Sequence, residues 1–101
     1  MRRDVFQAIA DPTRRVLLVM MTTQAMSLSV LSKHFSISRQ AISKHIKILQ
    51  ECELVIAQSQ GREVYYRLNV LPMKSISDWL EPFRAHWEGQ FKALDQLLTE
   101  I

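Results

Sequence analysis

The stretch from Phe35 to Leu49 constrains the fold more than any other part of the chain. When residues 39–50 are placed at about 100° per residue, polar side chains fall on one side and apolar side chains on the other. The polar side carries Arg39, Gln40, Ser43, Lys44, Lys47 and Gln50. Ser38 precedes this pattern, and its hydroxyl is a good acceptor for a backbone N–H of the first helical turn. The pattern predicts a helix from Arg39 to Gln50 with an apolar, buried inner face and a basic, solvent-exposed outer face.

The charges are distributed unevenly along the chain. Between Pro12 and Gln50 there are six Lys or Arg residues and no Asp or Glu, whereas the part from Val70 onward is net acidic. The formal net charge of +3 therefore understates how basic the central segment is. A one-sided positive field favours a polyanion as partner, because each neutralised phosphate releases condensed counterions. An ordinary solvated surface helix remains the alternative interpretation.

The length and composition indicate one folded domain, residues 1–101, that is mostly helical. No apolar run approaches the roughly 20 residues of a membrane span, and no signal peptide is present, so we expect a cytoplasmic protein without a membrane partner. The single cysteine, Cys52, has no partner for an internal disulfide. It is either a plain, partly buried cysteine or a thiol switch, and its neighbours Glu51 and Glu53 disfavour the thiolate that a switch needs.

Two helices are expected before the central stretch. The first is short and has apolar residues at helical spacing, namely Val5, Phe6 and Ile9. Asp11 as N-cap and Pro12 as first helical residue begin the second helix, which we expect to end near Met21. Its expected core residues are Val16, Leu17, Val19 and Met20. The polar segment Thr22–Ser27 is expected to be a loop.

A third helix, about Leu28 to His34, leads through a short turn into the basic helix. Helix, short turn, helix is an arrangement that places the second helix in the major groove of DNA. After it, Leu54–Ser59 and Glu63–Leu68 have the composition and alternation of strands. Gly61 between them suits the positive φ of a tight hairpin, with Arg62 projecting from its tip. The expected fold is mainly α with a small β-hairpin, in the order α-α-α-α-β-β-α.

A long helix is expected over residues 72–101. Its apolar residues are separated by threes and fours, namely Ile76, Leu80, Phe83, Trp87, Phe91, Leu94, Leu98 and Ile101. This seam is longer than one small core covers, so we expect a second copy of the chain to cover it. The alternative is that the helix folds back on its own domain. Pro82 removes one backbone donor and predicts a kink, or a false helix start, near residues 78–82.

Taken together, these segments resemble the ArsR family of winged helix-turn-helix repressors, in particular its small members without a metal site. The resemblance rests on Phe6–Arg15, Ser38–Leu49, Leu54-Val55, Gly61–Leu68, Trp79-Leu80 and His86–Glu88. It implies a homodimer, joined through the first and last helices, that binds a pseudo-palindromic operator in double-stranded DNA and represses a promoter, often its own. The expected dimer interface consists of Val5, Phe6, Ile9, Leu80, Phe83, Trp87, Phe91, Leu94 and Leu98.

The expected DNA-binding residues are Ser38, Arg39, Gln40, Ser43, Lys44, Lys47 and Arg62. Arg39 and Gln40 are expected to contact base edges, since a guanidinium pairs well with guanine and a side-chain amide with adenine. The other positions on the helix are expected to bind phosphates and so fix the register of the protein on the duplex. Arg62 is expected on the DNA backbone or in the minor groove.

Several other functions are disfavoured. Metal-sensing relatives carry cysteines in the third helix or Asp and His ligands along the last helix, whereas Asp78, His86 and Glu100 here are too far apart along the last helix to form one site. We therefore expect no metal and no cofactor, and no enzymatic site is indicated. His45 falls on the dry side and is expected to be a core histidine. A winged-helix module that binds proteins without specific DNA binding is the competing function, and the sequence identifies no inducing ligand.

Overall fold

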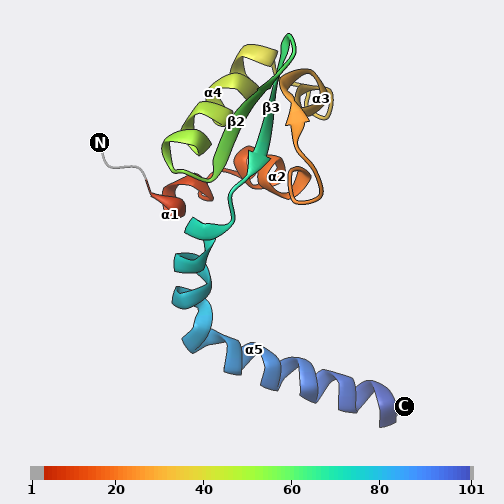
Figure 1. Cartoon of the computed structure of the whole chain (residues 1–101). Coiled ribbons are helices and arrows are strands. Elements are labelled where there is room, and N and C mark those ends of the chain that lie inside the picture. Colours follow the sequence, from red (N-terminus) through yellow and green to blue (C-terminus); the bar gives the residue numbers. More distant parts are fainter. Residues whose placement is uncertain (1–3, 101) are drawn as a thin grey trace.

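The computed structural model describes residues 4–100 and has a small helical domain from which one long helix projects (Figure 1). In chain order the elements are α1 (Val5–Ala8), α2 (Pro12–Met20), β1 (Met26–Ser27), α3 (Leu28–Ser32), α4 (Arg39–Glu51), β2 (Val55–Gln60), β3 (Glu63–Leu68), the 3-10 helix η1 (Leu71–Met73) and α5 (Lys74–Glu100). The prediction of a mainly helical winged helix-turn-helix fold is confirmed. Ile101, which the pattern assigned to the apolar seam, lies outside the described residues.

Short polar side chains set where four of the helices begin. Asp4, Asp11, Ser27 and Ser38 each accept the backbone N–H three residues later, at 3.0, 3.0, 3.3 and 3.1 Å respectively. These N–H groups have no partner within their own helices, so each cap stabilises a helix start. Ser38 thereby fixes the first turn of α4 at Arg39, as the sequence predicted.

The core lies between α2, α3, α4 and the start of the hairpin. Its fully buried large side chains are Leu17, Leu31, Ile42, Ile46, Leu49 and Leu54. Half of these belong to one face of α4, so the opposite face of that helix is left to solvent. Cys52 is also buried in this core, which agrees with its interpretation as a plain cysteine.

The inward face of α2 differs from the prediction. Leu17 is buried as expected, and it is joined in the core by Leu18 and Met21. Val16 and Val19 are exposed, so their assignment to the core was wrong. Every residue from 16 to 21 is apolar, so the sequence pattern does not fix the rotation of this helix. Packing against α4 decides it.

The sheet has three antiparallel strands in the order β1-β3-β2, one more than expected. The prediction that residues 22–27 form only a loop was wrong at its end, where Met26 pairs with Tyr66 and Ser27 with Tyr65. A strand of two residues is too short to show an alternating pattern, and it exists only through its pairing with β3.

The β2–β3 hairpin forms the predicted wing. The two strands pair in register from Val55 opposite Leu68 to Gln60 opposite Glu63, which leaves Gly61 and Arg62 as a two-residue turn. Gly61 has φ of 67°, the positive value expected at the first position of a type II′ turn. Arg62 is therefore held at the exposed tip of the wing.

Helix α5 is unbroken through Pro82, and Figure 1 shows that it changes direction in its light-blue part, near residue 80 on the colour bar. The predicted kink is thus confirmed and a false start is excluded. Near the bend, the ring centroid of Trp79 lies 6.1 Å from that of Phe6 of α1, in an edge-on arrangement, and 5.2 Å from that of Phe83, whose ring is tilted relative to it. After the bend, α5 leaves the domain, and the radius of gyration of 17.4 Å exceeds the roughly 13 Å of a compact chain of this length.

Candidate nucleic-acid interface

The outer face of α4 and its cap present their polar side chains to solvent. The exposed residues are Ser38, Arg39, Gln40, Ser43, Lys44 and Lys47. Their exposure follows from the burial of Ile42, Ile46 and Leu49 on the other face. All predicted DNA-binding positions of this helix therefore share one accessible surface.

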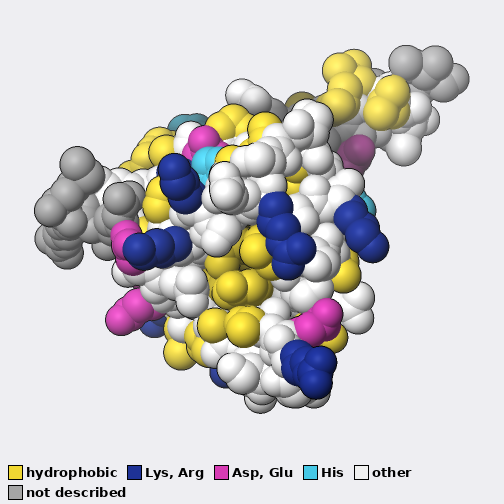
Figure 2. Space-filling view, turned by 90° about the horizontal axis from the view of Figure 1, so that it is seen from above, with side chains coloured by type: hydrophobic (Ala, Val, Ile, Leu, Met, Phe, Trp, Pro, Cys, Tyr) yellow, Lys and Arg dark blue, Asp and Glu magenta, His cyan; other side chains and the backbone are white. Residues whose placement is uncertain are grey.

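The tip of the wing lies at the same end of the molecule as the N-terminus of α4 and helix α3 (Figure 1). A hollow of about 270 Å³ separates these elements, and Arg39 from α4 and Arg62 from the wing both contribute to its lining. The other lining residues are Ser27, Leu28, Ser29, Glu63, Val64 and Tyr66. Figure 2 shows this end from above, with Lys and Arg side chains standing around a strip of hydrophobic side chains. Residues far apart in sequence thus form one basic rim around an apolar floor.

A second hollow, of about 500 Å³, adjoins the first turns of α4. Four predicted DNA-binding residues line it, namely Ser38, Arg39, Gln40 and Ser43. The fifth lining residue is Leu28, which comes from the start of α3 and lines the first hollow as well. The sequence pattern did not single out Leu28, because the first residue of a short apolar helix carries no signal for a surface role. Its position becomes evident only when α3 is packed against α4.

Two cations of the basic segment, Arg14 and Arg15, donate hydrogen bonds to the end of α1 and do not belong to the outer face of α4. Arg14 donates from Nε to the carbonyl of Ala8 at 2.9 Å and from Nη2 to the carbonyl of Gln7 at 3.0 Å. Arg15 donates from Nη1 to the carbonyl of Ile9 at 2.8 Å. These bonds tie the end of α1 to α2. The guanidinium groups of Arg14 and Arg15 are therefore held by carbonyls of the N-terminal segment, and the cations on the outer face of α4 are Arg39, Lys44 and Lys47.

His45 lies on the inner side of α4, where it faces the start of α2. Its Nδ1 atom is 3.5 Å from Nη1 of Arg14 and 3.8 Å from Oδ2 of Asp11. The side chain is partly buried. These contacts and the partial burial agree with the prediction of a structural histidine.

Asp11, the N-cap of α2, has a pKa shifted from its ordinary value. The backbone N–H of Arg14 donates to Asp11 and holds the pKa of this carboxyl below its ordinary value, with His45 and the charge of Arg14 acting in the same direction and partial burial opposing them. A carboxyl with a lowered pKa in the folded state stabilises the fold above the ordinary aspartate pKa. That contribution is lost as the pH falls through the lowered value.

We therefore expect Asp11→Ala to lower the free energy of unfolding by about 1 kcal/mol at pH 7, the usual cost of removing a helix N-cap. The difference from the parent protein should begin to shrink below about pH 4, where Asp11 protonates in the unfolded chain, and should be lost as the pH falls through the lowered pKa of the folded state. Urea unfolding at a series of pH values measures this. Asp11→Asn is the matched control, because asparagine caps the helix but does not titrate. A constant difference between parent and Asp11→Ala down to pH 2 would contradict the role of the charge.

Comparisons with known proteins bear directly on this surface. The family described as "HTH domain" matches residues 13–67, which include both helices of the motif and the wing. The Transcriptional repressor SdpR of Bacillus subtilis (strain 168) is 35% identical over 80 residues, covering 79% of this chain and 89% of that protein. A crystal structure of an ArsR family transcriptional regulator, RHA00566, superimposes with a TM-score of 0.71 at 31% identity, covering 82% of this chain and 86% of its own. The chain belongs to the ArsR family of helix-turn-helix regulators.

A second structure supports the same assignment over more of the chain. The ArsR-like transcriptional regulator from Rhodococcus sp. RHA1 has a TM-score of 0.72 and 34% identity, covering 96% of this chain and 89% of its own. This ArsR-family protein is accordingly a DNA-binding transcriptional regulator and not an enzyme.

Metal ligands do not gather in the described part of this ArsR-family protein. Within the residues that the structure describes, no three His, Cys, Asp or Glu side chains are placed to hold a metal ion. Over the same residues, no helix combines the length and apolar character required to cross a membrane.

The residues predicted for a dimer interface fall into two groups in this regulator. Val5 is only 7% exposed and Ile9 packs against the core, so the chain itself largely covers them. Leu80 is half-buried. The exposed members are Phe6, Phe83, Trp87, Phe91, Leu94 and Leu98. The accessible apolar surface therefore lies mainly on α5, beginning where that helix leaves α1.

Proposed function

We propose that this regulator is a homodimeric repressor that occupies a promoter through a pseudo-palindromic operator. The observation that carries the proposal is the exposed outer face of α4, whose basic and amide side chains stand beside the wing tip around one end of the domain. A helix with such a face suits the major groove, and a wing suits the adjacent backbone. Repression follows if the bound dimer excludes polymerase from the promoter.

In this proposal the side chains of α4 and its cap divide by the part of the DNA that they contact. Arg39 and Gln40, in the first turn, contact base edges, because their planar groups form paired hydrogen bonds with guanine and adenine. Ser38, Ser43, Lys44 and Lys47 hold phosphates and set the register. Ser38 accepts the N–H of Ala41, so its hydroxyl remains a donor for a phosphate oxygen. Arg62 contacts the backbone or the minor groove beside the wing.

The second half of the proposal concerns the long helix. We propose that residues 1–101 form a single domain and that α5 is its dimerisation helix. After the bend, the side chains of Phe91, Leu94 and Leu98 are 66%, 50% and 62% exposed. So much apolar surface on a projecting helix is costly in water, and pairing with a second copy removes it. Two copies related by a two-fold axis would present two α4 helices to half-sites about one helical turn, or a multiple of it, apart.

The test begins with selection of preferred duplexes from a random library by the full-length protein. Fluorescence anisotropy then compares the selected duplex with a shuffled duplex of the same length across a salt series. We expect a preference for the selected duplex that survives rising salt, with two chains bound per duplex. Equal and steeply salt-dependent binding to both duplexes would reject a sequence-specific repressor. A dimer that ignores DNA even at low salt would favour the competing function, a protein-interaction module built on α5.

Lys47→Ala is expected to weaken binding to all duplexes by a similar factor and leave the sequence preference unchanged. Lys47 is exposed two turns along α4 from its start, where a phosphate contact is expected rather than a base contact. The slope of log K against log salt should become shallower by about 1 per bound chain. Lys92→Ala, on α5, is the control with the same charge change and should leave the slope unaltered. A changed base preference in Lys47→Ala would contradict the assignment.

A further inference from the structure

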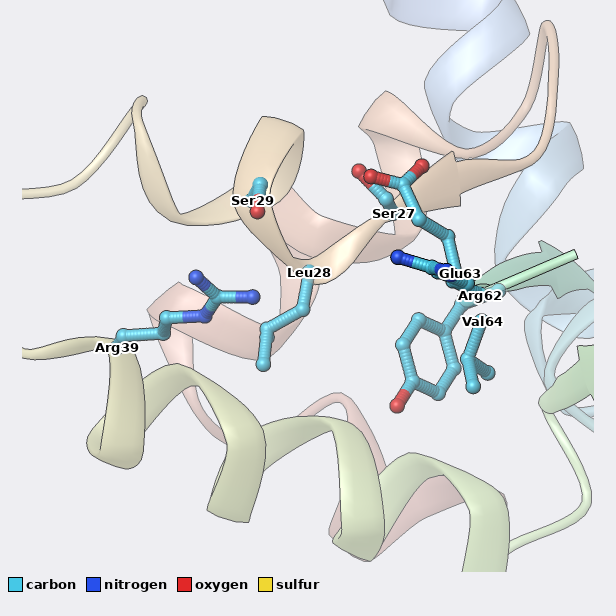
Figure 3. Close-up of a pocket in the computed structure, with 8 residues that line it drawn as sticks. Ser27, Leu28, Ser29, Arg39, Arg62, Glu63 and Val64 are labelled. Atoms are coloured by element: carbon cyan, nitrogen blue, oxygen red, sulfur yellow. The ribbon is translucent and has the colours of Figure 1, made fainter.

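One side chain of the DNA-facing surface has a chemistry unlike its neighbours. Leu28 lines both hollows at this end of the molecule. Figure 3 shows its side chain pointing into the space between Arg39 of α4 and the wing residues Arg62, Glu63 and Val64. The isobutyl group is half-buried, so part of it belongs to the core and part to the surface. It forms an apolar wall beside the two residues proposed to contact bases.

The chemistry of this wall selects what it can accept from DNA. Arg39 and Arg62 of the adjoining hollow suit a phosphate, but a phosphate placed against the Leu28 side chain itself is disfavoured, because the isobutyl group offers no hydrogen-bond donor. The edges of the bases in the major groove carry mostly hydrogen-bonding groups. The 5-methyl group of thymine is an apolar group at this edge, and apolar side chains contact it in protein–DNA complexes.

We propose that Leu28 receives the 5-methyl group of a thymine in each operator half-site, next to the base pair contacted by Arg39 or Gln40. This inference rests on the proposed function, since it requires α4 to lie in the major groove. Arg39 and Gln40, the two residues proposed to contact bases, line the same hollow as Leu28, so a base pair that reaches them also lies beside this wall. Leu28 is then a specificity-determining residue supplied by the first helix of the motif rather than by the reading helix.

The experiment replaces each thymine of the selected duplex, one at a time, by deoxyuridine, which removes only the methyl group. At one position of each half-site the affinity of the parent protein should fall about fourfold, the transfer value of one buried methyl group. Replacement in both half-sites should lower it about fifteenfold if the two effects add. Uracil at the remaining positions should have little effect. A duplex in which no uracil weakens binding overturns the inference while leaving the proposed function intact.

Variants of Leu28 test whether its side chain is the group that contacts the thymine methyl group. Leu28→Ala should bind the thymine and uracil duplexes equally, because the wall is gone. Val30→Ala is the matched control, since Val30 is an exposed residue of the same helix and lines neither hollow, and it should retain the full uracil effect. Circular dichroism establishes that both variants are folded, and Leu28→Met, which keeps an apolar side chain, replaces Leu28→Ala if that variant is not.

The outcomes separate the two proposals. Leu28→Met should change the size of the uracil effect, and Leu28→Ala should abolish it. An unchanged effect in the folded Leu28 variants assigns the methyl contact to another residue and overturns the inference. A selection that enriches no duplex overturns the proposed function together with the inference.

Discussion

Replacing Phe91 and Leu94 together by glutamate is expected to convert the proposed homodimer into monomers and to weaken operator binding by about 10²- to 10⁴-fold. The two side chains are 66% and 50% exposed on the part of α5 that has left its own domain. If a second copy covers them, each glutamate puts a charge into an apolar contact and removes the burial of a large side chain. Losing the dimer should cost much DNA affinity. In a dimer, binding of one subunit holds the other at a high effective concentration near the second half-site, and monomers lack this advantage.

Sedimentation velocity measures the change in oligomeric state, and anisotropy on the selected duplex measures the change in affinity. The two new negative charges also repel DNA, so the control must carry them too. Ala85→Glu with Gln96→Glu places the same charges on the opposite side of α5, about half a turn from the apolar seam. This control should remain a dimer and lose little affinity. If the Phe91 and Leu94 variant also stays dimeric, α5 is not the dimerisation helix.

Arg39→Ala is expected to lower affinity for the selected duplex by about 5- to 150-fold, which corresponds to about 1–3 kcal/mol for a lost bidentate base contact. Arg39 is the first residue of α4, is exposed, and lines both the hollow between that helix, α3 and the wing and the second hollow beside the first turns of α4. Because the proposed contact of Arg39 is to a base and not to a phosphate, the preference at one base pair of each half-site should disappear.

Repeating the selection with the variant measures that preference directly. Arg39→Lys is the informative control, because it keeps the charge but loses the planar fork that matches guanine. It should recover part of the overall affinity and little of the preference. Unaltered affinity and an unaltered selected sequence in Arg39→Ala would show that α4 does not read DNA through its first turn.

The elements that the sequence predicted well are those whose signals are local. Ser38 and Asp11 mark helix starts because a capping side chain acts on an N–H three residues away. The outer face of α4 was predictable because its two faces differ in polarity along a single helix. The same holds for Gly61, whose positive φ is a property of its own turn.

The errors and omissions involve contacts between distant parts of the chain. The rotation of α2 could not be read from a run of six apolar residues, and strand β1 has two residues that need β3 to pair with. Arg14 and Arg15 counted as part of a basic segment, yet they bind the carbonyls that end α1. In each case the sequence contains the groups but not the packing that selects their partners.

The sequence by itself determined that this chain has a capped basic helix, a wing, and a long helix with an apolar seam, since each depends on residues within a few positions of one another. Only the tertiary structure decided which side chains surround the start of α4. Leu28, Arg39 and Arg62 come from three elements, and they line one hollow because α3 and the hairpin pack against the same core. Apolar burial is non-directional, so it specifies that these elements pack but leaves their relative placement to the complete set of contacts.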